Sequence, residues 1–416
     1  MTLPAQILVT FDFTSGATFG YGFTLDDDKY GLLNTGTLSA NSTPEPTVDL
    51  TPNVRSINIR RGRNIMRDTY EAGTCTVRVY DSDGSWNPQN VNSIYYPFLT
   101  PLRKLRVSAT VSGVDYYLFS GYTTDYKYSY DQAENVGYVD ITCSDAFRLM
   151  QQATVTTVAS ATAGQDTGTR IGKILDQVSW PTSMRSIDTG GTSTLCQVDP
   201  GTSRTSLDAL KNCEFSEQGA FYIDQEGTAN FLSRTNVIKK AGDTPIEFDQ
   251  TTGIPYTNLV FAFDDKLIIN SAGMTIIGGT QQIAEDAASI AKYFSHQLNE
   301  SNLVAQTNAD ALNIAQIYVA TRAETTIRID SMSVDLLDTD VPTATMLALD
   351  YFSNLKITNV QPDGSTIVKT LQAQGLDWNI TPNSMKVTVT TLEPIVEGFI
   401  LDSAISGIID TNILAY

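Results

Sequence analysis

The residue that most constrains the chemistry of this chain is its single histidine, His296. Ser-His-Asp and Cys-His catalysis, and zinc sites of the H-E-x-x-H type, would all have to use this one side chain. It occurs in the segment KYFSHQL, where the apolar spacing predicts a helix, and a half-exposed helical histidine is the simpler interpretation. We therefore predict that the chain has no catalytic site and is not an enzyme.

Metal, nucleotide and thiol motifs are incomplete as well. The segment from Asp81 resembles the start of a calcium loop, but its sixth and twelfth positions hold Trp86 and Asn92 rather than glycine and glutamate. A turn closed by aspartate side chains explains it better. No G-K-[ST] phosphate motif occurs, and the sequence predicts neither a cofactor nor a bound metal. The cysteines lack C-x-x-C spacing and are expected to be small buried residues: Cys75, Cys143, Cys196 and Cys213.

The acidic balance of the chain limits its partners. The formal net charge is −19, from 46 acidic and 27 basic residues, which argues against a protein that wraps nucleic acid. One interpretation is simple solubility. The other is a channel wall along which a polyanion passes without binding, and two acidic stretches supply the candidates: Asp26, Asp27, Asp28, Asp335, Asp338 and Asp340.

The 416 residues suffice for roughly two to four domains. No apolar run approaches the ~18 residues of a membrane helix. The opening MTLPAQILVTFDF lacks the pattern of a secretory signal. We expect the protein to begin at or near Met1 and to be made and assembled in a cytoplasm.

The periodicity predicts an α+β fold that is mainly β. Residues 1–150 alternate apolar and polar side chains with period two, which is typical of an antiparallel sheet or barrel. Residues 151–250 form a small α+β unit, residues 251–395 return to strands with inserted helices, and residues 396–416 are an apolar, acidic tail.

Apolar residues at helical spacing and capping residues predict four helices, and a hairpin is predicted between the second and the third. The helices are expected from Ile171 to Val178, after a Thr205 cap, from Ile283 to Leu298, and after an Asn308 cap. The segment FYIDQEGTANFLSR predicts the hairpin, with a turn at Asp224–Gly227.

Five arginines gather in one short segment of this acidic chain: Arg55, Arg60, Arg61, Arg63 and Arg67. They form either a solvated strand end or a docking segment. In the second case their guanidinium groups would hold carboxylates of a neighbouring subunit in a bidentate manner.

A series of short motifs follows in order: Arg61-Gly62-Arg63, Tyr70-Glu71-Ala72-Gly73, Asp83-Gly84-Ser85-Trp86-Asn87-Pro88-Gln89-Asn90, Tyr95-Tyr96-Pro97, Pro101-Leu102-Arg103 and Leu118-Phe119-Ser120-Gly121-Tyr122. This series resembles the N-terminal signature of phage minor tail and baseplate hub proteins. The similarity covers most of residues 1–240 and becomes weaker afterwards. The resemblance gives the following candidate residues for the family motif and for contacts between subunits: Arg60, Arg61, Gly62, Arg63, Gly73, Asp83, Gly84, Trp86, Asn90, Tyr95, Tyr96, Pro101, Arg103, Gly121 and Tyr122.

The resemblance implies two barrel-like tube domains per chain, with an α+β domain between or beside them. It implies a trimer at the tail tip of a virion, in which three chains with two tube domains each match the six-fold tail tube. The implied partners are a distal tail or tube protein and fibre or tip proteins, and phage DNA would pass without specific binding.

Two other functions remain open. A hexameric distal-tail adaptor would also be structural, with one tube-like unit per copy. A tail-borne hydrolase or receptor-binding protein would need a site that the sequence does not mark, although 46 acids always supply carboxylate pairs.

Overall fold

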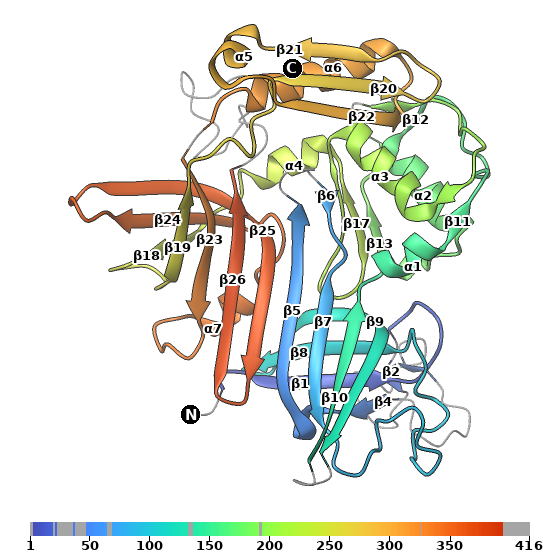
Figure 1. Ribbon diagram of the computed structural model, residues 1–416, viewed down its shortest axis with the longest axis vertical. Helices are drawn as coiled ribbons and strands as arrows, with labels where there is room; N and C mark the ends of the chain where they lie inside the picture. Colours follow the sequence, from blue (N-terminus) through green and yellow to red (C-terminus); the bar gives the residue numbers. More distant parts are fainter. Residues whose placement is uncertain are drawn as a thin grey trace.

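The computed structural model describes residues 3–19, 21–22, 36–37, 47–64, 69–131, 136–190, 194–325 and 327–393. Strands fill the lower half of the molecule and its left side, an α/β unit lies at the upper right, and a small sheet with helices lies at the top (Figure 1). The predicted class, α+β and mainly β, is confirmed.

The first β half is built from antiparallel strands with alternating burial. In β7, for example, Cys75, Val77 and Val79 are fully buried while Thr74 and Arg78 are exposed. Its strands are β1 (Gln6–Asp12), β4 (Thr47–Asp49), β5 (Val54–Asn64), β6 (Thr69–Tyr70), β7 (Thr74–Tyr80), β8 (Lys104–Val111), β9 (Val114–Asp131) and β10 (Val136–Ser144). A short parallel pair, β2 (Tyr21–Gly22) and β3 (Gly36–Thr37), and the 3-10 turn Thr51–Asn53 accompany them.

The α/β unit follows the predicted order. Asp166 caps α2, Thr205 caps α3 as expected, and β16 and β17 form the expected hairpin. Its helices are α1 (Phe147–Gln152), α2 (Thr167–Gln177), α3 (Ser206–Glu217) and α4 (Arg234–Lys240), with the 3-10 turn Thr182–Met184. Its strands are β11 (Thr154–Val155), β12 (Gln165–Asp166), β13 (Arg185–Ile187), β14 (Leu195–Cys196), β15 (Arg204–Thr205), β16 (Ala220–Ile223) and β17 (Ala229–Leu232).

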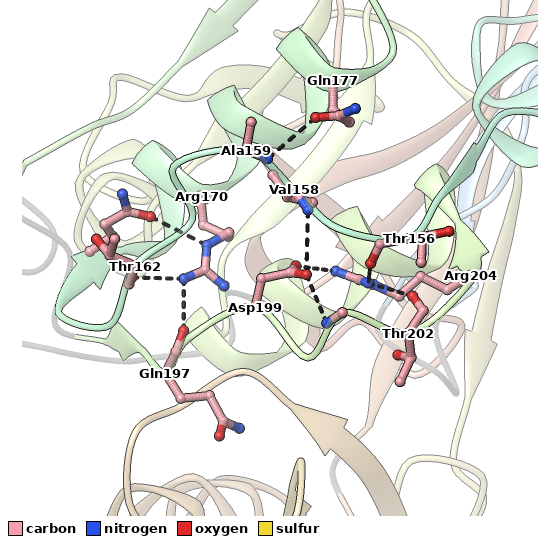
Figure 2. Close-up of polar contacts among 12 residues, drawn as sticks. Thr156, Val158, Ala159, Thr162, Arg170, Gln177, Gln197, Asp199, Thr202 and Arg204 are labelled. Carbon is pink, nitrogen blue, oxygen red and sulfur yellow. Dashed lines mark hydrogen bonds and ion pairs between the residues drawn. The ribbon is translucent and has the colours of Figure 1, made fainter.

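One buried arginine, Arg170, and one half-buried arginine, Arg204, hold the irregular parts of this unit together (Figure 2). Arg170 is 2% exposed, and its Nη2 donates to the carbonyls of Thr162 at 2.9 Å and Gln197 at 2.7 Å. The Nη2 of Arg204 lies 2.5 Å from the Asp199 carboxylate. The Arg170 bonds thus satisfy two backbone carbonyls, whereas the Arg204–Asp199 contact is an ion pair between side chains.

The second β half contains β18 (Ile246–Asp249), β19 (Thr257–Ala262), β23 (Arg328–Asp335), α7 (Thr343–Leu347), β24 (Asn354–Val360), β25 (Thr366–Thr381) and β26 (Ser384–Leu392). A small sheet with two helices is inserted after β19: β20 (Ser271–Ile276), β21 (Gln282–Glu285), α5 (Ala287–Tyr293), β22 (Gln297–Leu303) and α6 (Asn308–Arg322). None of the helices in the described part of the chain is long and apolar enough to cross a membrane.

Two predictions for this insert were wrong. The helix expected from Ile283 to Leu298 is confined to α5, because Ile283 lies in β21 and Leu298 in β22. The helix ends where Phe294 takes a φ of 62°. Thr307, rather than Asn308, caps α6, since its side chain and that of Asp310 form a reciprocal capping box.

The two β halves are joined into one sheet of 14 strands. The link is the antiparallel pairing of β5 with β25, which lie side by side in Figure 1 as a blue and a red strand. The path through the described strands runs from β19 to β4 and does not close into a barrel. Domain boundaries near 150, 250 and 395 stay a prediction.

Both halves contain the same arrangement of three strands. In the first half β8, β9 and β10 have 8, 18 and 9 residues, and in the second half β24, β25 and β26 have 7, 16 and 9. Each long middle strand pairs with the short strand along its first part and with the hairpin strand along its second part.

The backbone conformation just before the short strand is also repeated in the two halves. Leu102 and Phe352 both have a φ of 65°, an uncommon conformation for bulky residues, and both precede the short strand by two positions. The Leu102 N–H donates to Thr123 O at 2.7 Å, and the Phe352 N–H donates to Ala373 O at 2.9 Å. The two donors, and likewise the two acceptors, are separated by 250 positions, from 102 to 352 and from 123 to 373. The chain therefore carries an internal structural repeat.

Candidate functional site: a polar sheet face across both β halves

The central strands have one buried apolar face and one open polar face. In β25, Trp378 and Ile380 are buried while Asp377 and Asn379 are exposed. The same alternation occurs in β5, β7, β10, β23 and β26. Because β5 pairs with β25, the polar face continues without a break from one β half to the other.

Small uncharged side chains dominate this face. They are Ser56, Asn58, Thr74, Thr76, Thr142, Ser331, Ser333, Asn379, Thr388 and Thr390. The pairing of β5 with β25 forms a seam between the two β halves. Across this seam, Asn379 Nδ2 donates to Asn58 Oδ1 at 2.6 Å. Ser333 and Thr388 hydroxyls lie 3.0 Å apart. The face is therefore polar, and its own side chains satisfy part of its hydrogen-bonding capacity.

Four pairs of opposite charges lie on this face, and Arg55 in addition lies over the Tyr80 ring. The pairs are Arg78 with Asp140, Lys386 with Asp335, Lys127 with Asp125, and Arg60 with Asp377. Arg78 donates to both carboxylate oxygens of Asp140, at 2.7 and 2.8 Å. Lys386 Nζ lies 3.2 Å from Asp335. The charges of these pairs thus balance locally, although the whole chain is strongly acidic.

The acidic residues expected on a channel wall are spread over several places. Asp335 lies on the polar face. Asp338 and Asp340 are exposed in the turn after β23, where Asp338 Oδ1 accepts the Asp340 N–H at 3.1 Å. Asp26, Asp27 and Asp28 lie outside the described residues.

Two glycines face each other where β5 pairs with β25. A Cβ added to Gly62 would lie 3.6 Å from the Cα of Gly375, and one added to Gly375 would lie 3.1 Å from Thr390 Cβ. Register shifts in β25 between Ala373 and Gly375, so the strand bends at this point. Gly375 thus leaves little room for a side chain, whereas a Cβ on Gly62 would lie at ordinary van der Waals distance.

Arg61 lies under the seam rather than on the surface. Its side chain is 3% exposed, Nη1 is 3.0 Å from Asp350 Oδ1, and Nη2 donates to Ile223 O at 3.0 Å. The guanidinium also lies over the Tyr351 ring, 4.7 Å from its centroid. We expected Arg61 to contact a neighbouring subunit, but its guanidinium is used inside the chain. It ties β5 to the α/β unit and to the segment before β24.

A buried carboxyl group connects the same region to α1. Asp145 Oδ2 accepts the Gly73 N–H at 2.6 Å, and Oδ1 accepts the Phe147 N–H at 3.0 Å. Burial raises the pKa of Asp145 to about 7, against the lowering effect of these two backbone bonds. Gly73 leaves no room for a side chain, because an added Cβ would lie 2.9 Å from Asp145 Oδ2.

The motif residues of the β7–β8 loop mainly build the loop itself. Trp86 is 4% exposed and stacks on Phe13, and Tyr95 packs against both rings. Asp83 closes a turn by accepting the Ser85 N–H, as expected for this segment. Asn90 Nδ2 donates to Gly84 O at 2.9 Å.

The remaining motif residues divide between core and surface. Tyr122 is 1% exposed and donates to Ala17 O, and a Cβ on Gly121 would lie 2.5 Å from the Phe119 ring. Arg103 Nε donates to Phe98 O at 3.2 Å. Exposed members are Arg60, Tyr96 and Pro101, and for them subunit contact stays a prediction.

A groove of about 550 Å³ opens at the Gly62 end of the polar face. Arg60, Arg63, Lys266 and Arg328 line it together with acidic residues. Arg328 donates to both oxygens of the Asp264 carboxylate, at 2.8 and 3.0 Å, and Lys266 lies 3.4 Å from Asp264. Arg328 and Lys266 thus share the Asp264 carboxylate, and Arg60 lies opposite Asp377 in the β5–β25 pairing.

His296 lies between α5 and β22, not on a helix, with Nε2 3.1 Å from Tyr293 O and 3.8 Å from Asp265. Among the described residues, no group of three or more His, Cys, Asp or Glu side chains could hold a metal ion. The proposal that the chain is not an enzyme stays a prediction.

No protein-family profile matches the sequence, and no curated protein matches it significantly. Solved structures do match the fold. One is the 43 kDa tail protein of prophage MuSo2 from Shewanella oneidensis, with a TM-score of 0.52 and 13% identity over 85% of this chain and 95% of that chain. Another is a tail protein from Neisseria meningitidis MC58, with a TM-score of 0.52 and 9% identity over 84% of this chain and 94% of that chain. The resemblance predicted from the sequence motifs is therefore confirmed at the level of fold: this chain has the fold of phage tail proteins.

Proposed function

We propose that this chain is a structural protein of a phage tail, and that three copies form a hub ring at the tail tip. The observation that carries the proposal is the internal repeat, with β8–β10 matched by β24–β26 at a separation of 250 positions. Three chains with two such units each would present six similar units. Such a ring could continue a six-fold tail tube, since ring closure requires the same contact to recur around an axis.

We further propose that the polar sheet face lines the channel of this ring. DNA must pass through such a channel without being held. Each lysine or arginine that contacts a phosphate releases counterions and adds affinity, so unpaired bases on the wall would slow passage. A face of serine, threonine and asparagine with mostly paired charges offers few such contacts. From the sequence we expected acidic and small polar side chains on this wall, and we now propose small polar side chains with mostly paired charges.

Cryo-electron microscopy of assembled tails tests position, symmetry and orientation together. We expect three copies at the tip, with Asn58 and Asn379 facing the lumen. Six copies around the ring would favour the distal-tail adaptor, and an outward-facing polar sheet would refute the channel assignment.

DNA passage gives a functional test of the same face. The double change Asp140→Asn and Asp335→Asn leaves Arg78 and Lys386 without their acids. We expect normal assembly but slower DNA ejection, with a larger effect at low salt because phosphate attraction is then less screened. Glu247→Gln is the matched control, since it removes an exposed partner of Lys356 away from this face. Equal ejection rates in all three proteins would refute a role of charge balance.

The anchoring of distal tail, fibre or tip proteins belongs to the same proposal. A tail-borne hydrolase is the less favoured alternative. His296→Ala should leave infection unchanged if the chain is structural, and loss of a hydrolytic activity in that variant with intact tails would favour the alternative.

A further inference from the structure

Two surface segments of this chain are long and uncharged. In the β7–β8 loop, no Asp, Glu, Lys or Arg occurs from Gly84 to Leu102. The second segment runs from Thr251 through β19 to Phe263, again without a charged residue. Charged residues make up 18% of the chain, and other uncharged runs of similar length occur, for example from Gln151 to Gln165 and from Leu267 to Ala284. Depletion of charge is typical of the core of a protein–protein interface.

The β7–β8 loop presents apolar side chains from a rigid frame. Val91 is 67% exposed and Ile94 is 70% exposed. The frame beneath them is bonded, because Ser93 Oγ donates to Ser85 O at 2.6 Å and the buried Trp86 anchors the loop. The loop would therefore lose little conformational entropy on binding, which favours its use as a contact.

The second segment is an open strand edge. β19 pairs with β23 on one side, and no described strand pairs with its other side. Val260, Phe263 and Ile327 are 45%, 68% and 49% exposed there. Exposed edges are usually protected by charged side chains, especially lysine, against pairing with other chains. The absence of charge along β19 indicates that this edge is covered in the assembled state.

The two segments lie far apart in one chain. β19 is at the left of Figure 1, and the loop that follows β7 is at the lower right. β19 is also one end of the strand path, whereas the loop packs on β1 near the other end. They cannot meet within a chain, but a second copy placed head to tail would bring one against the other.

We propose that the β7–β8 loop of one copy docks on the β19 edge of the next copy, with Val91 and Ile94 against Val260, Phe263 and Ile327. This inference rests on the proposed ring, because a contact between two different patches repeats around an axis until it closes. A contact of either patch with itself would stop at a dimer. The docked loop would cover the unpaired edge and connect the sheet of one copy to that of its neighbour.

Two single substitutions and their mixture test the proposal. Ile94→Asp removes the loop patch and Phe263→Asp removes the edge patch, and both positions are exposed enough for the chain to fold. Each variant alone should remain monomeric by native mass spectrometry, where the unaltered chain forms rings. Mixed in equal amounts, they should give a heterodimer and nothing larger, since one intact loop then meets one intact edge. Phe294→Asp, at an 85% exposed phenylalanine on the insert, is the control and should keep the ring.

The possible failures are distinguishable. If the unaltered chain forms no ring, the proposed function and this inference are both refuted. If it forms rings and both variants still do, the ring stands and this contact is refuted. A dimer formed by either variant alone would show a patch contacting itself, which also overturns the head-to-tail contact.

Discussion

Ile59 and Trp378 lie opposite each other where β5 pairs with β25, and both are 2% exposed. Ile59 belongs to the first β half and Trp378 to the second, so one cross-strand pair joins the cores of both. A single apolar cluster does extend through both halves, from Ala5 to Val389. The two halves repeat one arrangement, but they do not have separate cores.

This shared core predicts that the β halves unfold together. Trp378→Ala should destabilise the chain by about 3–5 kcal/mol, the usual cost of truncating a buried aromatic residue. Hydrogen exchange should accelerate in β7 as much as in β23, because both strands depend on the same seam. Loss of protection in the second half alone would show that the halves are independent domains.

Arg61 should matter for folding rather than for docking. Arg61→Met leaves the Ile223 carbonyl without its donor and Asp350 without its partner, so we expect a loss of at least about 2–3 kcal/mol. Arg60→Met is the matched control, because the neighbouring side chain is exposed, and it should change stability by less than about 0.5 kcal/mol. Chemical denaturation measures both. Equal stabilities would contradict the intrachain role of Arg61.

Local elements could be predicted from the sequence because their causes are local. The alternation in β7, the Thr205 cap of α3 and the β16–β17 hairpin each depend on residues within a few positions. Ile283 and Leu298 show the limit of such patterns. Their spacing fits a helix, yet they lie in β21 and β22, where a sheet buries parts of the same segment.

The seam and the repeat could not be predicted in this way. Asn58 and Asn379 are bonded across 321 positions, and no local pattern specifies such a partner. The repeat is one of backbone conformation, with Leu102 in one half and Phe352 in the other. The charge balance of the polar face depends on this pairing as well, which is why a count of acids suggested an acidic wall.

Two glycines of α2 should respond to alanine in opposite directions. A Cβ on Gly168 would lie 1.7 Å from Asp188 O, whereas nothing lies within 4 Å of one on Gly172. Gly168→Ala should therefore cost about 2–3 kcal/mol through overpacking. Gly172→Ala should stabilise the chain by about 0.5–1 kcal/mol, since alanine is the better helix former. Thermal denaturation of the two variants measures both effects. A stabilising effect of Gly168→Ala would contradict the prediction and show that the start of α2 can shift to make room.

Asp145 should make stability fall as the pH rises. Its pKa is raised by burial to about 7 in the folded chain, from an ordinary value near 4 when unfolded. Between these values the folded state holds one proton more than the unfolded state. The stabilisation that comes from the proton on Asp145 is thus fully present below about pH 4 and is lost towards pH 7, with a slope of about 1.4 kcal/mol per pH unit.

The substitution Asp145→Asn removes this titration while other buried acids, such as Glu214 and Glu217, remain. Urea denaturation from pH 4 to 7 should show the unaltered chain losing more stability than the variant, although asparagine lowers stability overall by placing an amide N–H against a backbone donor. Parallel pH profiles in the two proteins would show that Asp145 is ionised throughout this range, with its bonds to Gly73 and Phe147 outweighing the cost of burial.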